Sequence, residues 1–212
     1  MGRPRYLVAT TNEGKVCEIR AMLDGLPLEL VGLDEYASIP PPDETGASFA
    51  ENARLKALYY ARASGLPAVA DDSGLEIDAM NGGPGIESAR FGGANTCYPE
   101  RFERIYRALH RAGRPDSPAR FVCALALAEG DAITFEARGT VEGTIAPRPA
   151  GTGGFGYDPI FFYPPLGRTL AEVSPEQKDA VSHRGVAFRE LRAFLLNRLG
   201  APASGPLEPD RR

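Results

Sequence analysis

Two adjacent carboxylates, Asp71 and Asp72, come directly after a short apolar run and precede Ser73 and Gly74. Carboxylates this close repel each other unless a cation or a proton offsets their charge. Oxygen ligands without a neighbouring histidine or cysteine suit Mg²⁺, which binds through one or two carboxylates and completes its coordination with substrate phosphates and water. The pair therefore indicates a magnesium site, although a solvated turn or a helix cap would use the same residues.

A second acidic pair, Asp43 and Glu44, follows three consecutive prolines at 40–42, which exclude a helix or a strand ladder. A loop of this kind could bring one more carboxylate to a metal across a cleft. On its own, however, an acidic pair in a proline-rich loop is more typical of an ordinary solvated surface.

Lysine is rare in this chain, because only three of its 24 basic residues other than histidine are lysine, namely Lys15, Lys56 and Lys178. Arginine occupies the generic surface positions. A compact ammonium on a flexible stem suits a crowded phosphate site in which a planar guanidinium would not fit. The three lysines are therefore candidate phosphate contacts, with chance as the alternative.

The segment 11–15, Thr-Asn-Glu-Gly-Lys, resembles the end of a Walker A loop. It is not one, because Ala9 stands where the first glycine belongs and Val16 replaces the magnesium-binding hydroxyl residue. It remains a turn before a helix, where free backbone N–H groups and the helix dipole favour an anion. An Asn-Gly turn that only caps a helix is the simpler alternative.

A second glycine-rich loop, 151–159, matches the dinucleotide-binding expression but leads into an apolar strand and not into a helix, so that match is weak. Its aromatic residues Phe155 and Tyr157 could stack on a base, and Asp158 could accept the N–H groups of the base; an aromatic plug in the core is the alternative. Farther along, His183 and Arg184 offer donors near a helix start, where capping or surface roles are more common.

The elements that must position these residues alternate between strand and helix in the first half of the chain, which favours a parallel arrangement there. A hairpin in the middle makes the sheet mixed, so we expect an α/β (mixed) fold with a cleft. The expected elements are strands at 6–10, 28–32, 68–78, 119–128, 132–145 and 160–163, helices at 15–23, 48–63, 99–112 and 186–199, a short helix after Ser174, and loops at 34–45, 81–95 and 151–159. The strand at 68–78 is expected to end at the charged pair Asp71 and Asp72 and to resume after Gly74, so that the two carboxylates lie at a strand end.

Composition limits the class of protein. With 212 residues and 43% hydrophobic content, the chain can bury one substantial core, so we expect a single domain at 1–200 and a disordered tail at 201–212. A net charge of −4 without a Lys/Arg run disfavours a nucleic-acid partner. The apolar runs are too short for a membrane span or a signal peptide, which favours the cytoplasm. Three widely spaced cysteines disfavour both a disulfide framework and a structural zinc site.

Five ordered segments together resemble the ITPase-like, non-canonical purine NTP pyrophosphatase family. They are TTNEGK at 10–15, SFAENARLKA at 48–57, ADDSGLEIDAMNGGPGIESAR at 70–90, GTGGFGYDPIF at 151–161 and SHRG at 182–185. The resemblance extends over about residues 5–199, and Thr11 stands where the family can have glycine. It implies a homodimer of two-lobed subunits, each with a long mixed β-sheet flanked by helices and a substrate cleft between the lobes.

The same resemblance implies hydrolysis of ITP, dITP and XTP to the monophosphate and pyrophosphate, with Mg²⁺ as cofactor. It implies that Asp72 is the general base and a metal ligand, and that Glu44 is the second metal ligand. The expected triphosphate contacts are Thr10, Thr11, Asn12, Glu13, Gly14, Lys15, Lys56 and Ser73. The expected base and sugar contacts are Phe155, Gly156, Tyr157, Asp158, Lys178, His183 and Arg184.

These assignments agree with the chemistry of phosphoryl transfer, in which cations neutralise charge on the leaving group and a carboxylate orients the attacking water. A site built for a 6-keto purine would leave polar groups unpaired against adenine. Two alternatives stay open: a related pyrophosphatase for modified pyrimidine or methylated nucleotides, and a nucleotide sensor that binds without turnover.

Overall fold

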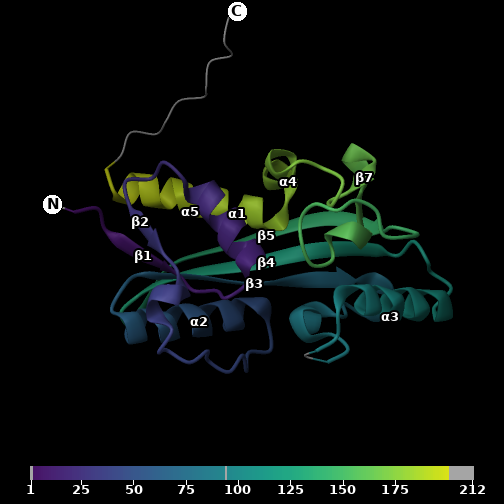
Figure 1. Cartoon of the computed structure of the whole chain (residues 1–212), viewed down its shortest axis with the longest axis horizontal. Helices are drawn as coiled ribbons and strands as arrows, with labels where there is room; N and C mark the ends of the chain where they lie inside the picture. The colour runs from purple at the N-terminus through teal and green to yellow at the C-terminus, as the bar shows by residue number, and fades with distance from the viewer. Residues whose placement is uncertain (1, 94, 201–212) are drawn as a thin grey trace, which may run out of the picture.

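The computed structural model describes residues 2–93 and 95–200, and its centre is a seven-stranded mixed β-sheet (Figure 1). The strand order is β2-β1-β3-β4-β5-β6-β7. β1 is parallel to β2 and β3, whereas the later neighbours are antiparallel. The mixed sheet expected from the sequence is therefore confirmed. The strands are β1 (Arg5–Val8), β2 (Glu29–Val31), β3 (Ala68–Ile77), β4 (Pro118–Glu129), β5 (Ala132–Ile145), β6 (Phe161–Tyr163) and β7 (Arg168–Thr169).

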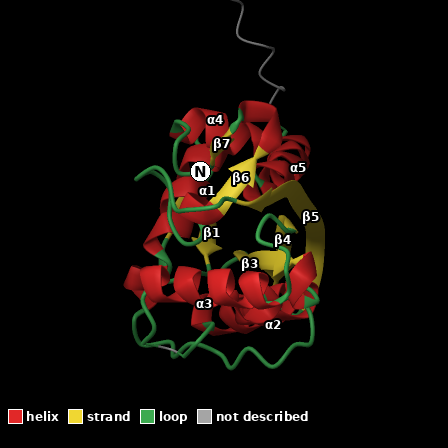
Figure 2. Ribbon diagram, turned by 90° about the vertical axis from the view of Figure 1, so that its right-hand side faces the viewer, coloured by secondary structure: helices red, strands yellow, loops and turns green. Residues whose placement is uncertain are grey.

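Helices cover both faces of this sheet: α1, α4 and α5 lie over one face, and α2 lies over the other (Figures 1 and 2). α3 lies at the far end of the long strands, where it packs in a core with Leu75 and Ile77, whose side chains share the face of the α1 and α5 core. Ser48 caps α2 through its side-chain oxygen, which accepts a hydrogen bond from the backbone N–H of Glu51 at 3.2 Å. Gly65 ends α2 in the left-handed conformation, with a φ of 71°. The helices are α1 (Glu13–Leu23), α2 (Phe49–Ser64), α3 (Tyr98–Arg111), α4 (Pro175–Val181) and α5 (His183–Arg198).

The central strand β4 contributes to the cores on both faces, because successive side chains of a strand point in opposite directions. Cys123 and Leu125 pack in the core beneath α1 and α5, whereas Val122 and Ala124 pack in the core beneath α2. At the other end of the long strands, α3 packs against a third core, which includes Phe121. The strands β3, β4 and β5 therefore extend through both lobes of the subunit.

The sequence suggested that the acidic pair lies at a strand end, but the pair lies in the middle of β3. β3 continues without a break because β4 pairs with its whole length, with Asp71 opposite Leu125 and Asp72 opposite Ala124. On the other side, β1 pairs with β3 only as far as Val69. Beyond that point, no strand of the described residues covers this edge of β3, so both carboxylates lie where the sheet is open.

Other boundaries differ in ways that local hydrogen bonds explain. α5 begins at His183 and not at residue 186, because the side-chain oxygen of Ser182 accepts from the backbone N–H of Gly185 at 3.0 Å and caps the helix. Two segments expected to be irregular contain short 3₁₀ helices, η1 (Leu33–Tyr36) and η3 (Gly85–Arg90). The tail predicted at 201–212 lies outside the described residues. Across the described ranges, no helix is long and apolar enough to cross a membrane.

Candidate active site

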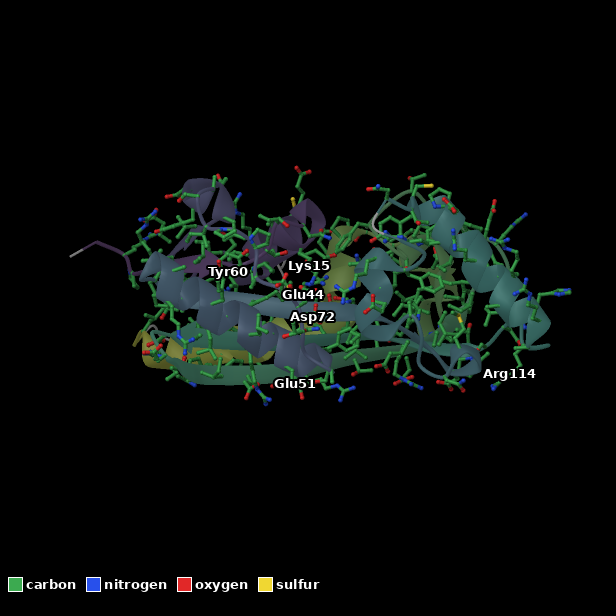
Figure 3. All side chains as sticks on the ribbon, turned by 90° about the horizontal axis from the view of Figure 1, so that it is seen from below. Lys15, Glu44, Glu51, Tyr60, Asp72 and Arg114 are labelled. Atoms are coloured by element: carbon green, nitrogen blue, oxygen red, sulfur yellow. The ribbon has the colours of Figure 1, made fainter. Side chains whose placement is uncertain are left out.

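A cavity of about 300 Å³ is lined by side chains from elements on both faces of the sheet. Figure 3 shows three of them, Lys15, Glu44 and Asp72, close together although they come from α1, a loop and β3. Two of the residues expected from the sequence, Glu13 and Gly14, do not line the cavity. Those that do are Thr10, Thr11, Asn12, Lys15, Glu44, Lys56, Asp72, Ser73, Phe155, Gly156, Tyr157, Asp158, Lys178, His183 and Arg184.

The N-terminus of α1 forms one wall of the cavity. The side chain of Asn12 caps the helix by accepting a hydrogen bond from the backbone N–H of Lys15 at 3.1 Å, and Thr10 Oγ1 accepts from the backbone N–H of Asn12 at 3.2 Å. Gly14 is shielded by Phe155, whose ring would lie 2.6 Å from a Cβ at this position. Glycine is therefore required there by close packing, while Glu13 is exposed.

Lys56 joins two carboxylates at the cavity wall. Its Nζ lies 2.9 Å from Glu44 Oε1 and 3.1 Å from Asp72 Oδ1. Asn52, one turn earlier on α2, donates from Nδ2 to Asp72 Oδ2 at 3.2 Å. The Oδ1 atom of Asn52 accepts from the backbone N–H of Gly46 at 2.8 Å, which ties the loop that carries Glu44 to the same helix. α2 thus fixes both carboxylates relative to each other.

The two carboxyl groups differ in their electrostatics. Burial raises the pKa of Asp72 above the ordinary aspartate value, and the ammonium groups of Lys56 and Lys15 offset this only in part. Burial acts in the same direction on Glu44, but Lys56 and Arg90 outweigh it, so the pKa of Glu44 lies below its ordinary value. Asp72 is consequently the more basic of the two, as a proton acceptor requires.

The donor set fits a cation that is shared with a substrate. Across residues 2–93 and 95–200, no group of three or more His, Cys, Asp or Glu side chains could hold a metal ion alone. Glu44 and Asp72 nevertheless present two carboxylates to one cavity, and Mg²⁺ commonly takes only one or two carboxylates from the protein and the remaining oxygens from phosphates and water.

Asp71 faces away from this carboxylate pair, because neighbouring residues of a strand point to opposite faces. Its side chain is fully buried, and its Oδ2 lies 3.0 Å from Lys15 Nζ and 3.1 Å from Arg184 Nη2. Burial opposes ionisation, but these two cations hold the pKa of Asp71 far below its ordinary value. The structure therefore places Asp72, and not Asp71, beside Glu44.

A buried ion pair lies at another part of the cavity. Lys178 Nζ is 2.5 Å from Asp158 Oδ2, and both side chains are at most 5% exposed. The same oxygen accepts from the backbone N–H of Phe155 at 2.8 Å, which fixes the 151–159 loop against α4. Burial raises the pKa of Asp158, and Lys178 offsets only part of this rise.

Glu18 connects the two cations of the α4 and α5 region. Its carboxylate oxygens lie 2.7 Å from Lys178 Nζ and 2.6 Å from Arg184 Nη1. Both cations also lie over the ring of Phe155, with Lys178 Nζ at 4.7 Å and Arg184 Cζ at 5.6 Å from its centroid. The ring is thus held at the cavity wall by two cation–π contacts.

His183 and Tyr157 are mostly turned into the core. The His183 ring stacks on Phe121 with a centroid distance of 4.8 Å, and burial followed by the charge of Arg184 lowers its pKa well below the ordinary value. His183 is therefore a neutral imidazole at pH 7. The hydroxyl group of Tyr157 donates to the carbonyl of Ser88 at 2.9 Å. Each reaches the cavity with only part of its surface.

Sequence reasoning missed six residues that line the cavity, namely Gly74, Ile86, Ser88, Ala89, Tyr98 and Phe121. It also missed two residues that hold site side chains without lining the cavity, Asn52 and Glu18. Both lie on the same helix face as a site lysine, since Asn52 is four residues before Lys56 and Glu18 is three residues after Lys15. That spacing is the signal that could have identified them. It is weak, because polar residues at such positions usually face solvent.

The comparisons with known proteins cover nearly the whole chain. A sequence model described as the Ham1 family matches residues 6–194. The dITP/XTP pyrophosphatase of Streptomyces coelicolor is 48% identical over 198 residues, which cover 92% of this chain and 99% of that protein. The protein of the same name from Thermus thermophilus is 46% identical over 187 residues, which cover 88% of this chain and 89% of that protein.

Solved structures agree with the sequence comparison. A HAM1 protein from Coxiella burnetii superimposes with a TM-score of 0.85 at 41% identity, covering 92% of this chain and 99% of that one. The Ham1 protein of Staphylococcus aureus gives a TM-score of 0.81 at 38% identity, with the same coverage. By its sequence, its fold and the extent of both matches, the chain belongs to the Ham1 family.

Proposed function

We propose that this protein hydrolyses the non-canonical purine nucleoside triphosphates ITP, dITP and XTP to the nucleoside monophosphate and pyrophosphate. Two relatives that are 48% and 46% identical to this chain bear the name dITP/XTP pyrophosphatase. The observation that carries the proposal is one cavity that combines the Glu44, Lys56 and Asp72 cluster with the Phe155, Lys178 and Arg184 cluster. The first suits a triphosphate, and the second suits a base.

In this proposal, Asp72 is the general base that accepts the proton of the attacking water, which its raised pKa favours. Lys15 and Lys56 neutralise charge that develops on the leaving pyrophosphate. Asn52 and Lys56 keep the Asp72 carboxylate in a fixed orientation. The displacement proceeds in line at the α-phosphorus and requires no covalent intermediate.

We propose Mg²⁺ as the cofactor, held by Glu44 and Asp72 together with the triphosphate. When bound, the ion supplies positive charge at the phosphate oxygens. Lys56 already balances both carboxylates, as its Nζ lies 2.9 Å from Glu44 and 3.1 Å from Asp72. It therefore keeps the two groups together before the substrate arrives.

The nucleoside end favours a 6-keto purine. Lys178 and Arg184 are donors without acceptor capacity, so each can donate to a keto oxygen, and the nearby ring of Phe155 can stack on the base. Adenine presents a 6-amino donor at the same place. Two cationic donors would then face a third donor, which is a strong basis for rejection.

We also propose that the chain forms a homodimer and acts in the cytoplasm on a free nucleotide. The similarity of its sequence to the family supports this. The net charge of −4 and the absence of a Lys/Arg run in the sequence disfavour a nucleic-acid partner.

Steady-state turnover over a panel of triphosphates tests the function. With Mg²⁺, we expect kcat/KM for ITP and XTP to exceed the value for ATP by about 100-fold or more, with pyrophosphate as the product and loss of turnover upon chelation. Release of orthophosphate, or equal rates on all purines, would contradict the proposal. A preference for modified pyrimidine or methylated nucleotides would indicate a related pyrophosphatase, and binding without turnover would indicate a sensor.

Replacing Asn52 with alanine should lower kcat/KM for ITP by about 10- to 100-fold, the effect of losing one hydrogen bond to a charged group. The change removes the donor to Asp72 and the acceptor for Gly46. Steady-state kinetics measures the effect, and circular dichroism checks the fold. Arg54→Ala is the matched control on the same helix, because Arg54 pairs with Glu136 at the surface. Equal kinetics for the two variants would disprove the role of Asn52.

A further inference from the structure

The buried carboxylate of Asp71 holds two cations with a single oxygen. Its Oδ2 is 3.0 Å from Lys15 Nζ, 3.1 Å from Arg184 Nη2 and 3.3 Å from Arg184 Nε. Its Oδ1 is buried and has no hydrogen-bond partner among the described residues. Both cations therefore share this one oxygen atom, and Arg184 has further partners in Glu18 and Ser73.

The two cations come from different parts of the chain and reach the same cavity. Lys15 belongs to the first turn of α1, and Arg184 belongs to the first turn of α5. The two helices lie on the same face of the sheet (Figure 1), and both side chains line the cavity. Asp71 is thus a bridge between wall residues and not a group sealed within the core.

The two residues that Asp71 bridges belong to the two sides of the proposed site. Lys15 lies at the phosphate side, since its neighbours are the cap of α1 and the backbone of β3. Arg184 lies at the base side, over the ring of Phe155 and beside Glu18. A charge shared between them is a physical route by which binding at one side can change the other.

Competition for one oxygen sets the sign of this effect. Two cations that share Oδ2 repel each other, so each weakens the hold of the other on Asp71. When Lys15 donates instead to a phosphate, the anion screens its charge and Oδ2 becomes available to Arg184 alone. The guanidinium is then more firmly oriented by its two N–H contacts with Asp71, and less orientational freedom remains to be lost when the base binds.

We propose that Asp71 is a positioning residue that couples the two halves of the site: capture of phosphate by Lys15 tightens the grip of Asp71 on Arg184 and so strengthens recognition of the base. The inference rests on the proposed function, because it assumes a phosphate contact at Lys15 and a base contact at Arg184. It makes selectivity for the base depend on an occupied phosphate side.

Two product fragments test the coupling without turnover. Calorimetric titration gives the Kd of inosine for the intact protein with Mg²⁺, first alone and then with saturating pyrophosphate. We expect inosine to bind at least about fivefold more tightly when pyrophosphate is present, which is the lower end of measured couplings between sites. An unchanged Kd would overturn the inference.

Variants separate the coupling from mere stability. In Asp71→Asn, pyrophosphate should no longer change the Kd of inosine, whereas in Cys123→Ala the wild-type coupling should persist. Cys123 is the matched control because its Sγ lies 3.9 Å from Asp71 Oδ2 in the same buried space and carries no charge there. Coupling that survives in Asp71→Asn would contradict the role of Asp71.

Lys15→Met gives a second, independent test, which also serves if Asp71→Asn fails to fold. In this variant no ammonium competes for Asp71 Oδ2, so this oxygen pairs with Arg184 alone whether or not phosphate is bound. Inosine alone should then bind as tightly as it binds the wild type with pyrophosphate present, and a merely structural role would not improve affinity. Weaker binding than in the wild type would overturn the inference. The proposed function fails separately, if the wild type shows no turnover in the triphosphate panel.

Discussion

Replacing Asp72 with asparagine should lower kcat for ITP by about a thousandfold, within the range that a general base contributes, while the substrate still binds. The substitution preserves the shape of the side chain and an acceptor for Lys56, but it removes the group that takes the proton. Steady-state kinetics gives kcat, and calorimetry gives the Kd of ITP for the inactive variant. A kcat within tenfold of the wild type would remove Asp72 from its role as base.

Asp43→Asn is the matched control for this prediction. It makes the same chemical change next to Glu44, at an exposed side chain that does not line the cavity. We expect kcat for this variant to stay within about twofold of the wild type, since exposed substitutions away from the site have small effects.

Because the pKa of Asp72 is raised, we also expect its ionisation to affect both the pH dependence of activity and the stability of the fold. Activity of the wild type should fall at a pH low enough to protonate Asp72, and bound Mg²⁺ moves that fall to lower pH because the cation favours the ionised carboxylate. A carboxyl group with a higher pKa in the folded state contributes stability at low pH that is lost as the pH rises through that value. At pH 7, Asp72→Asn should therefore resist urea at least as well as the wild type.

Much of the fold follows from local signals in the sequence. The hairpin between β4 and β5 and the cap of α2 at Ser48 lie where glycine, turn residues and capping side chains predict them. The mixed sheet follows from a hairpin placed after alternating strands and helices. These features depend on neighbours in the sequence, and the structure confirms them.

The position of the acidic pair could not be obtained in this way. Asp71 and Asp72 suggested a strand end because charge rarely continues a buried strand. Their backbone groups nevertheless pair with Leu125 and Ala124 of β4, and the early end of β1 opens the edge beside them. Both facts depend on contacts between distant segments, which no local pattern carries.

Only those parts of the candidate site that have a local signal could be predicted from the sequence. The three lysines were visible because lysine is rare here, and the structure gives each a separate carboxylate environment: Lys15 pairs with Asp71, Lys56 with Glu44 and Asp72, and Lys178 with Glu18 and Asp158. Glu18 is one of many glutamates on a helix, so only its place opposite α4 and α5 distinguishes it.

Replacing Lys178 with methionine should lower the free energy of unfolding by about 3–5 kcal/mol at pH 7, the typical cost of leaving a buried charge without its partner. Asp158 is the stranded group, because Lys178 is its only ion-pair partner within 4.0 Å among the described residues and its side chain is 3% exposed. Urea denaturation at pH 7 measures the loss. Arg62→Met is the control, since its exposed pair with Asp131 should contribute less than about 1 kcal/mol.

The loss of stability in Lys178→Met should be smaller at low pH and smaller after a second substitution, because each removes the charge of Asp158. Burial raises the pKa of Asp158, and without Lys178 the pKa should rise further, so stability of the variant is lost as the pH increases through that value and regained as it falls. The difference between variant and wild type should therefore shrink from pH 7 to pH 5. Adding Asp158→Asn to Lys178→Met removes the stranded charge and should recover part of the loss at pH 7. If the double variant were as unstable as the sum of the single ones, the buried charge would not be the cause, and lost packing of the lysine stem against Phe155 would explain the effect instead.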